Sequence, residues 1–352
     1  MNTIALNHIG EIRSGGGASK PSPIPQWIRE HIVFYYDVKK QGATNETLKE
    51  SAYLQDLSGK GRRMKLNNFL FDMMSGVDGY KNEAFVNVSG AIDIRFDHIN
   101  GRQIKGKPAQ DWDKFGYYRA KNMVERIIYC KWHVEGILDD NKVYVAQYTA
   151  YDNRVELHNG DNYIELDTNQ GKVGYNYISV ISDQPYSTDI TITQIPEYPG
   201  ALVTDGVDDY GLVENLSSGV KMLFMTVNPM KIDTTLYDQR KVLNVAFSVY
   251  NRPDTIAYNS NNPGGSTYID GELNESIRAN SLLDTKQVIT IVNDTVSIDN
   301  TRAPFFFRNT SSDKYAKMAF YNSIAFDSIP TEADGFTEQE LIDYVLTNII
   351  GQ

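Results

Sequence analysis

Alternation of apolar and polar residues with a period of two dominates the middle of this chain and restricts the folds open to it. It recurs at 84–88, 92–96, 143–146, 155–157, 163–166, 177–181 and 190–193. Successive side chains of a strand point to opposite faces, so the pattern predicts strands with one buried face. Asn-Gly and Asp-Asn turns separate the segments. Residues 79–200 are therefore predicted to form an antiparallel β-sandwich.

The flanking segments carry strand patterns of their own. Before the sandwich they lie at 32–36 and 66–71, and after it at 202–210, 220–227, 242–250, 287–297 and 304–308. A polar loop rich in Gly and Asn is predicted at 258–273. At 352 residues the chain exceeds one compact β-domain. The Pro-rich segment 195–200 is predicted to mark a domain boundary.

The two ends of the chain differ from its middle. Residues 1–26 combine a Ser/Gly-rich linker with Pro21, Pro23 and Pro25, which predict an extended run. This segment is either a disordered tail or a docking peptide, whose apolar contacts would come from Ile4, Leu6 and Ile9. The other end is predicted to be a short helix. It shows a capping box at Thr337 and Glu340, followed by Leu341, Ile342, Val345 and Ile349 at helical spacing.

Charge and composition exclude several classes of partner. A net charge of −11 disfavours nucleic acid and anionic membranes, which reward basic surfaces. The single cysteine, Cys130, allows no internal disulfide, which suits folding in a reducing cytoplasm. The sequence shows neither a secretory signal nor an apolar stretch of membrane-spanning length. We expect the protein to stay in the cytoplasm where it is made or to leave by another route, such as lysis with a phage particle.

The run Asp205-Gly206-Val207-Asp208-Asp209-Tyr210 resembles the start of laminin-G-like, or concanavalin-like, lectin domains. The segment 314–341 is similar to the end of such domains, and 56–61 (Asp-Leu-Ser-Gly-Lys-Gly) to a motif that usually lies close to the first one. The motifs at 56–61 and 205–210 are far apart in this chain, which implies an insertion. The resemblance thus implies a concanavalin-like jelly roll made of 27–78 and 201–352 and interrupted by the sandwich at 79–200.

A second resemblance concerns the residues 34–46, which read Phe-Tyr-Tyr-Asp-Val-Lys-Lys-Gln-Gly-Ala-Thr-Asn-Glu. This run is similar to proteins of Bacteroides phages, including crAss-like phages, that occur among virion structural and tail-associated proteins. The resemblance implies a virion location, capsid, portal or tail proteins as partners, and a homo-oligomer.

The sequence shows no recognisable set of catalytic residues. Concanavalin-like glycosidases carry Glu-x-Asp-x-(x)-Glu on one strand, but the nearest segment, 165–170, ends in Gln170 and lies in the insert. Cys130 and His133 would point to opposite faces of a strand, so a buried structural cysteine is the better interpretation. The sequence predicts no enzyme and no organic cofactor.

Calcium is the one ion for which the sequence offers ligands. Asp205, Asp208 and Asp209 supply hard oxygens within five residues, and jelly-roll lectins often bind Ca²⁺ near a loop rim. The same residues fit a tight turn in which the carboxylates cap backbone amides, and we favour that structural role.

A glycan site would need exposed aromatic rings beside polar side chains. The loop at 258–270 has this composition, and its candidate residues are Tyr258, Asn259, Asn261, Asn262, Tyr268 and Asp270. Trp112, Tyr117 and Tyr118 in the insert form a second such group.

These observations predict a phage structural protein: a head or tail appendage, a fibre, or a capsid-decorating subunit. Residues 1–26 would anchor it, and the sandwiches would contact host-surface glycan or neighbouring subunits. Two alternatives remain open. One is a glycan-active depolymerase whose carboxylate pair comes from distant segments, and the other is a bacterial surface lectin.

Overall fold

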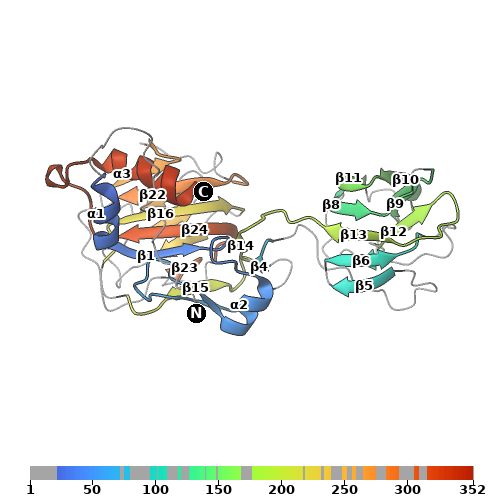
Figure 1. Cartoon of the computed structure of the whole chain (residues 1–352), viewed down its shortest axis with the longest axis horizontal. Helices are drawn as coiled ribbons and strands as arrows, with labels where there is room; N and C mark the ends of the chain where they lie inside the picture. The colour runs from blue at the N-terminus through green and yellow to red at the C-terminus, as the bar shows by residue number, and fades with distance from the viewer. Residues whose placement is uncertain are drawn as a thin grey trace, which may run out of the picture. The chain divides into compact units, whose positions relative to one another are not determined.

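The computed structural model describes residues 22–71, 75–79, 96–100, 102–108, 118–119, 127–138, 140–147, 150–167, 177–216, 219–230, 234–238, 248–251, 256–258, 265–274, 283–292, 305–308 and 315–351. The strands in this part of the chain form antiparallel sheets, and a short helix ends it (Figure 1). The predicted mostly β fold with several antiparallel sheets and a C-terminal helix is confirmed.

The chain divides into two compact units. The first contains residues up to Phe71, Ser75–Val77 and Gly200–Gln352, and the second is chiefly Asp78–Pro199. The second unit thus interrupts the first in sequence.

Two sheets build the first unit. The eight-stranded sheet contains β1 (Ile32–Asp37), β4 (Gly76–Val77), β14 (Leu202–Val203), β16 (Met222–Pro229), β20 (Ser266–Ile269), β21 (Glu272–Leu273), β22 (Gln287–Val292) and β24 (Met318–Phe326). Its order is β21-β20-β22-β16-β24-β14-β4, with β1 also paired to β24. The seven-stranded sheet contains β2 (Tyr53–Leu54), β3 (Met64–Asn67), β15 (Tyr210–Val213), β17 (Thr234–Asp238), β18 (Ser248–Asn251), β19 (Ile256–Tyr258) and β23 (Phe305–Phe306). Its order is β19-β18-β17-β23-β15-β3-β2.

One apolar core lies between these two sheets. Phe34 and Tyr36 of β1 stack with ring centroids 4.9 Å apart, and both contact Phe306 of β23 edge to face. All three side chains are fully buried. Burying a side chain of this size stabilises the fold by about 1.5–3 kcal/mol. The alternate positions of β1 are buried as well, so the outer face of the eight-stranded sheet must also be covered.

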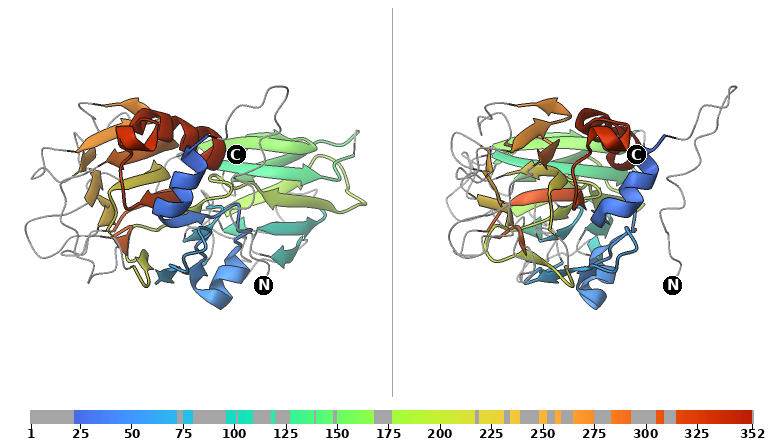
Figure 2. Two further views of the ribbon diagram at one scale, coloured as in Figure 1. Left: turned by 60° about the vertical axis from the view of Figure 1, so that its left-hand side comes forward. Right: turned by 90° about the vertical axis from the view of Figure 1, so that its left-hand side faces the viewer.

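The cover consists of α1 (Ile24–His31) and α3 (Glu338–Val345), with η5 (Glu332–Asp334) before α3 and η6 (Leu346–Ile350) after it. Trp27 of α1 packs against Phe326 of β24 and Phe336, with ring centroids 5.4 Å and 5.9 Å apart. Figures 1 and 2 show α1 and α3 side by side on this sheet. Thr337 and Glu340 form the predicted capping box, which fixes the start of α3.

Two helices of the first unit were not predicted. The sequence predicts an extended run through Pro23 and Pro25, but α1 begins at Ile24. Pro is tolerated in a first helical turn because the N–H that it lacks would have no partner there. In the polar stretch that follows β1, α2 (Asn45–Ser51) starts at a capping box of Thr44 and Thr47.

The second unit also pairs two sheets around a core. The five-stranded sheet, of order β11-β8-β13-β6-β5, contains β5 (Phe96–Asn100), β6 (Gln103–Gly106), β8 (Ile127–Glu135), β11 (Gly160–Asp167) and β13 (Ile190–Gln194). The four-stranded sheet, of order β10-β9-β12-β7, contains β7 (Tyr118–Arg119), β9 (Val143–Gln147), β10 (Ala150–Leu157) and β12 (Tyr177–Ser182). Trp132 and Ile192 of the first sheet share a core with Val145 of the second. The strand patterns predicted at 84–88 and 92–95 lie outside the described residues.

The chain passes from the first unit into the second after β4 and returns to the first unit at β14, and these two strands are neighbours in the sheet. Leu202 of β14 pairs with Val77 of β4, and Val203 pairs with Gly76. We call this pair of strands the stem. Asn45 of α2 closes its free edge, since its Oδ1 accepts from the Val77 amide at 2.6 Å. A Cβ on Gly76 would collide with Asn45 Oδ1, so glycine is required there.

One predicted loop is partly strand. The Gly- and Asn-rich stretch 258–273 contains β20 and β21, which form a hairpin beside β22. Its turn lies at Asp270 and Gly271, both with positive φ. Pairing with the buried strand β22 makes this stretch a strand, and the composition of the stretch itself does not reveal that pairing.

Candidate functional site

The Asp205–Asp209 loop connects the stem strand β14 to β15. Asp205 Oδ1 accepts from the amide of Val207 at 2.7 Å and, at 3.4 Å, from that of Asp208. Gly206 turns the chain with φ +76°, and a Cβ there would lie 2.7 Å from Lys317 Cβ. The loop therefore has the tight-turn structure that we favoured from the sequence.

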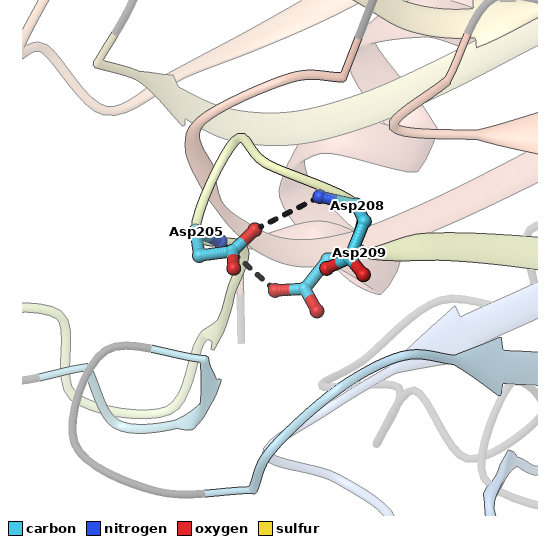
Figure 3. Close-up of side chains that lie close together, drawn as sticks. All are labelled: Asp205, Asp208 and Asp209. Atoms are coloured by element: carbon cyan, nitrogen blue, oxygen red, sulfur yellow. Dashed lines mark hydrogen bonds between the residues drawn. The ribbon is translucent and has the colours of Figure 1, made fainter. Parts of the chain in front are cut away.

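The three carboxylates converge within this turn. One oxygen from each of Asp205, Asp208 and Asp209 lies within 4.8 Å of the others (Figure 3). Asp205 is partly buried and Asp208 exposed, whereas Asp209 is completely buried. Asp209 Oδ2 accepts from the Asp205 amide at 2.9 Å, but its Oδ1 has no hydrogen-bond partner within the described part of the chain.

Burial also changes the acidity of Asp209. Desolvation raises the pKa of its carboxyl to about 7, and the charges of Asp205 and Asp208 act in the same direction. The Asp205 amide and the Ser75 hydroxyl lower this pKa but do not cancel the effect of burial. A cation bound to the free oxygen would favour the ionised carboxylate. The three side chains offer only carboxylate oxygens as ligand atoms, and Ca²⁺ prefers oxygen ligands.

Of the predicted glycan residues, Tyr268 and Asp270 have side chains that the structure describes, and both make contacts within the fold. Tyr268 lies in β20, is 8% exposed, and donates its hydroxyl to Glu338 of α3 at 2.5 Å. Asp270 occupies the hairpin turn and accepts from the Val288 amide at 2.8 Å. Both side chains hold the edge of the sheet, so the prediction of an exposed Tyr268 ring is wrong.

The other predicted positions lie partly or wholly outside the described residues. Tyr258 and Tyr118 are described only as backbone, at the ends of β19 and β7. Asn259, Asn261, Asn262, Trp112 and Tyr117 lie outside, as do the proposed anchor residues Ile4, Leu6 and Ile9.

The first three residues of the glycosidase-like segment 165–170 end β11, and 168–170 lie outside the described residues. Glu165 is exposed on that strand, and the side chains of Leu166 and Asp167 lie outside the described set. Its neighbour two residues earlier, Tyr163, is 72% exposed. These positions share the outer face of the five-stranded sheet.

The outer face holds a polar cluster that the sequence analysis did not identify. His133 of β8 pairs with Asp161 of β11, and its Nδ1 lies 2.6 Å from Asp161 Oδ1. Glu135 lies 3.6 Å from the other ring nitrogen. The hydrogen bond with Asp161 is the main reason why the pKa of His133 is raised. His133 and Asp161 are distant in the sequence and meet only because of the register in which β8 and β11 pair. The alternation of Lys131, His133 and Glu135 could have indicated a polar outer face for β8.

Among the residues that the structure describes, no helix is both long and apolar enough to cross a membrane. Comparison of the chain with protein-family models, with curated proteins and with solved structures finds no match.

Proposed function

We propose that this chain is a non-catalytic structural subunit of a phage particle, anchored by residues 1–26 and presenting two β units for contacts with subunits or host-surface glycan. The observation that carries the proposal is the stem. Two separately cored β units in one chain, joined through paired strands, suit a part that bridges neighbours. The run at 34–46 that resembles phage proteins contains the last four residues of β1, the loop after it and the first two residues of α2.

The first unit is proposed to be a concanavalin-like jelly roll interrupted by a second sandwich. Two large antiparallel sheets that share one core support this assignment. The motif that ends at Tyr210 leads into β15, and the segment similar to the end of such domains contains β24, a central strand of the eight-stranded sheet.

The carboxylates of the Asp205–Asp209 loop do not have the arrangement that a depolymerase needs. A retaining glycosidase needs two carboxyl groups ~5 Å apart and open to a sugar. In the Asp205–Asp209 loop, Asp205 and Asp209 accept bonds from backbone amides, and Asp209 is completely buried. These two carboxylates hold a turn.

The test is association with particles. Full-length protein and a variant lacking residues 1–21, which leaves α1 complete, are mixed with phage particles from which the protein has been removed, and the mixtures are sedimented. We expect only the full-length protein to sediment with the particles, while both give the same circular dichroism spectrum. Cryo-electron microscopy of the native particle should then show 1–26 against a portal, capsid or tail protein. A particle-free protein, or release of reducing sugar from host capsule, contradicts the proposal.

A second candidate function, calcium binding in the Asp205–Asp209 loop, is favoured by the unpartnered Asp209 Oδ1. Such a site would brace the loop that follows the stem. Calorimetric titration with CaCl₂ and thermal unfolding with and without Ca²⁺ test it. We expect a higher Tm with Ca²⁺ for the wild type and no shift for Asp209→Asn, because one buried ligand charge is lost. Asp161→Asn, in the other unit, is the control and should keep the shift. The proposal fails if millimolar Ca²⁺ leaves the wild-type Tm unchanged.

A further inference from the structure

The outer face of the five-stranded sheet carries an array of polar side chains. Inner and outer positions alternate strictly along the strands: Trp132, Val134, Ile164 and Ile192 point into the core, and their neighbours point out. The register places one outward residue from each of four adjacent strands in a row, namely Asp161, His133, Thr193 and Gln103. Neighbouring strands lie ~4.8 Å apart, so the row is a line of closely spaced hydrogen-bonding groups.

Many of these groups are already held in position. His133 is tied to Asp161 at 2.6 Å, and Gln103 Nε2 donates to Thr193 Oγ1 at 3.0 Å. In the next row, Lys131 Nζ lies 2.7 Å from Glu197 Oε2. Side chains fixed in this way lose less conformational freedom when a ligand binds.

Tyr163 is the aromatic member of this array. It lies on the edge strand β11, directly opposite Lys131 and between Asp161 and Glu165. Tyr163 is 72% exposed, the highest value among the exposed large hydrophobic residues of the described part of the chain. An exposed ring surrounded by fixed polar groups offers a stacking surface and directional hydrogen bonds side by side.

We propose that this face is a saccharide-binding platform, in which the Tyr163 ring stacks on a sugar and Asp161 and His133 bond its hydroxyl groups. Sugars present apolar C–H faces beside hydroxyl groups, which matches one ring among donors and acceptors. A protein partner would need a larger apolar centre than Tyr163 provides.

The charges of the face select an uncharged saccharide. Asp161 and Glu165 flank the ring along β11, and Glu135 and the exposed Lys105 lie further along the same face. Lys131 and the His133 ring are already paired to carboxylates. An anionic polymer would meet repulsion here, and nucleic acid is disfavoured for the same reason. The inference names the ligand class for the glycan contacts of the proposed function, and it holds for the isolated protein whether or not a particle carries it.

The experiment measures binding of the full chain to soluble polysaccharides. Native gels containing dextran, laminarin, galactomannan or xylan are compared with gels containing the anionic polymers alginate or heparin. The best ligand then goes to calorimetry. We expect retardation by at least one uncharged polymer and binding about tenfold weaker or worse for Tyr163→Ala, given the usual value of an aromatic stacking contact. Tyr163→Phe keeps the ring and should bind within a few-fold of the wild type.

Leu138→Ala is the matched control, because Leu138 is another exposed apolar residue of the same unit, at 41%. It should bind like the wild type, and all variants should share the wild-type Tm. The inference is wrong if none of the uncharged polymers retards the wild type, if only alginate or heparin does, or if Tyr163→Ala binds as well as the wild type. Association with particles is measured in a separate experiment. A failure to bind saccharide therefore does not contradict the structural role, and a failure to associate with particles does not contradict saccharide binding.

Discussion

The side chain of Asn45 takes the place of a neighbouring strand for Val77. Its Oδ1 accepts from the Val77 amide at 2.6 Å, and its Nδ2 donates to the Val77 carbonyl at 3.4 Å. Both residues are buried, so neither backbone group can turn to water instead. A single amide from α2 thus satisfies the outer edge of the stem.

Removing this amide should destabilise the first unit. Asn45→Ala leaves a buried N–H and a buried C=O unpaired, and we expect a loss of ~1–3 kcal/mol in the free energy of unfolding. Urea denaturation followed by circular dichroism measures it. Lys49→Ala, on the exposed side of the same helix, should change stability little. Equal stability of Asn45→Ala and the wild type would show that the edge does not depend on Asn45.

Asp209 should make stability fall as pH rises. Its folded-state pKa is about 7 against an ordinary value of 3.8, so the folded state holds a proton that the unfolded state releases between these pH values. Stability is therefore lost progressively from pH 4 to about pH 7, by roughly 4 kcal/mol at most. Without Ca²⁺, Asp209→Asn should be more stable than the wild type at pH 7.5 and equal to it at pH 4.

Thermal unfolding across this pH range gives the answer. Asp208→Asn is the control, since Asp208 is exposed and its loss should leave most of the pH dependence. A pH profile that Asp209→Asn does not alter would exclude Asp209 as its source.

The capping box of α3 should contribute measurably to stability. Thr337 Oγ1 accepts from the Glu340 amide at 3.2 Å, while Glu340 Oε2 accepts from the Thr337 amide at 2.7 Å. Thr337→Ala should cost ~1 kcal/mol. The exposed Thr347 supplies the comparison: Thr347→Ala should leave the urea midpoint nearly unchanged. The idea is contradicted if the two variants shift the midpoint equally.

His133 should titrate above the ordinary pKa of histidine. Its folded pKa is raised mainly by the hydrogen bond with Asp161. Its contribution to stability is therefore fully present below pH 6.5 and is lost as pH rises through the folded pKa. NMR of the imidazole protons measures this pKa directly. Asp161→Asn should lower the pKa of His133. Asp183→Asn, which removes a carboxylate elsewhere in the same unit, should leave that pKa unchanged.

Local chemistry explains which features could be predicted from the sequence. The turn at 56–61 is specified by its own residues, because Asp56 accepts from the amides of Ser58 and Arg62, while Gly59 and Gly61 take positive φ. The helix at the C-terminus is specified in the same way by its cap and its apolar spacing. Such features depend on neighbours within a few residues.

Features that depend on distant partners were missed. The Tyr268 ring is covered by a helix 70 residues further along the chain. The His133–Asp161 pair, 28 residues apart, exists only in one strand register. A stretch rich in Tyr and Asn has the same composition whether it is an exposed loop or is covered by a distant helix, so the sequence does not distinguish the two cases.

The stem has a consequence for how the chain can be rebuilt. Val77 and Leu202 are direct partners across two hydrogen-bonded strands, and such partners have Cα atoms only ~5 Å apart. A short reverse turn can span that gap. The inserted unit is therefore a cassette: it can be exchanged for another module, or deleted in favour of a two-residue hairpin, while the host core keeps every strand that it uses.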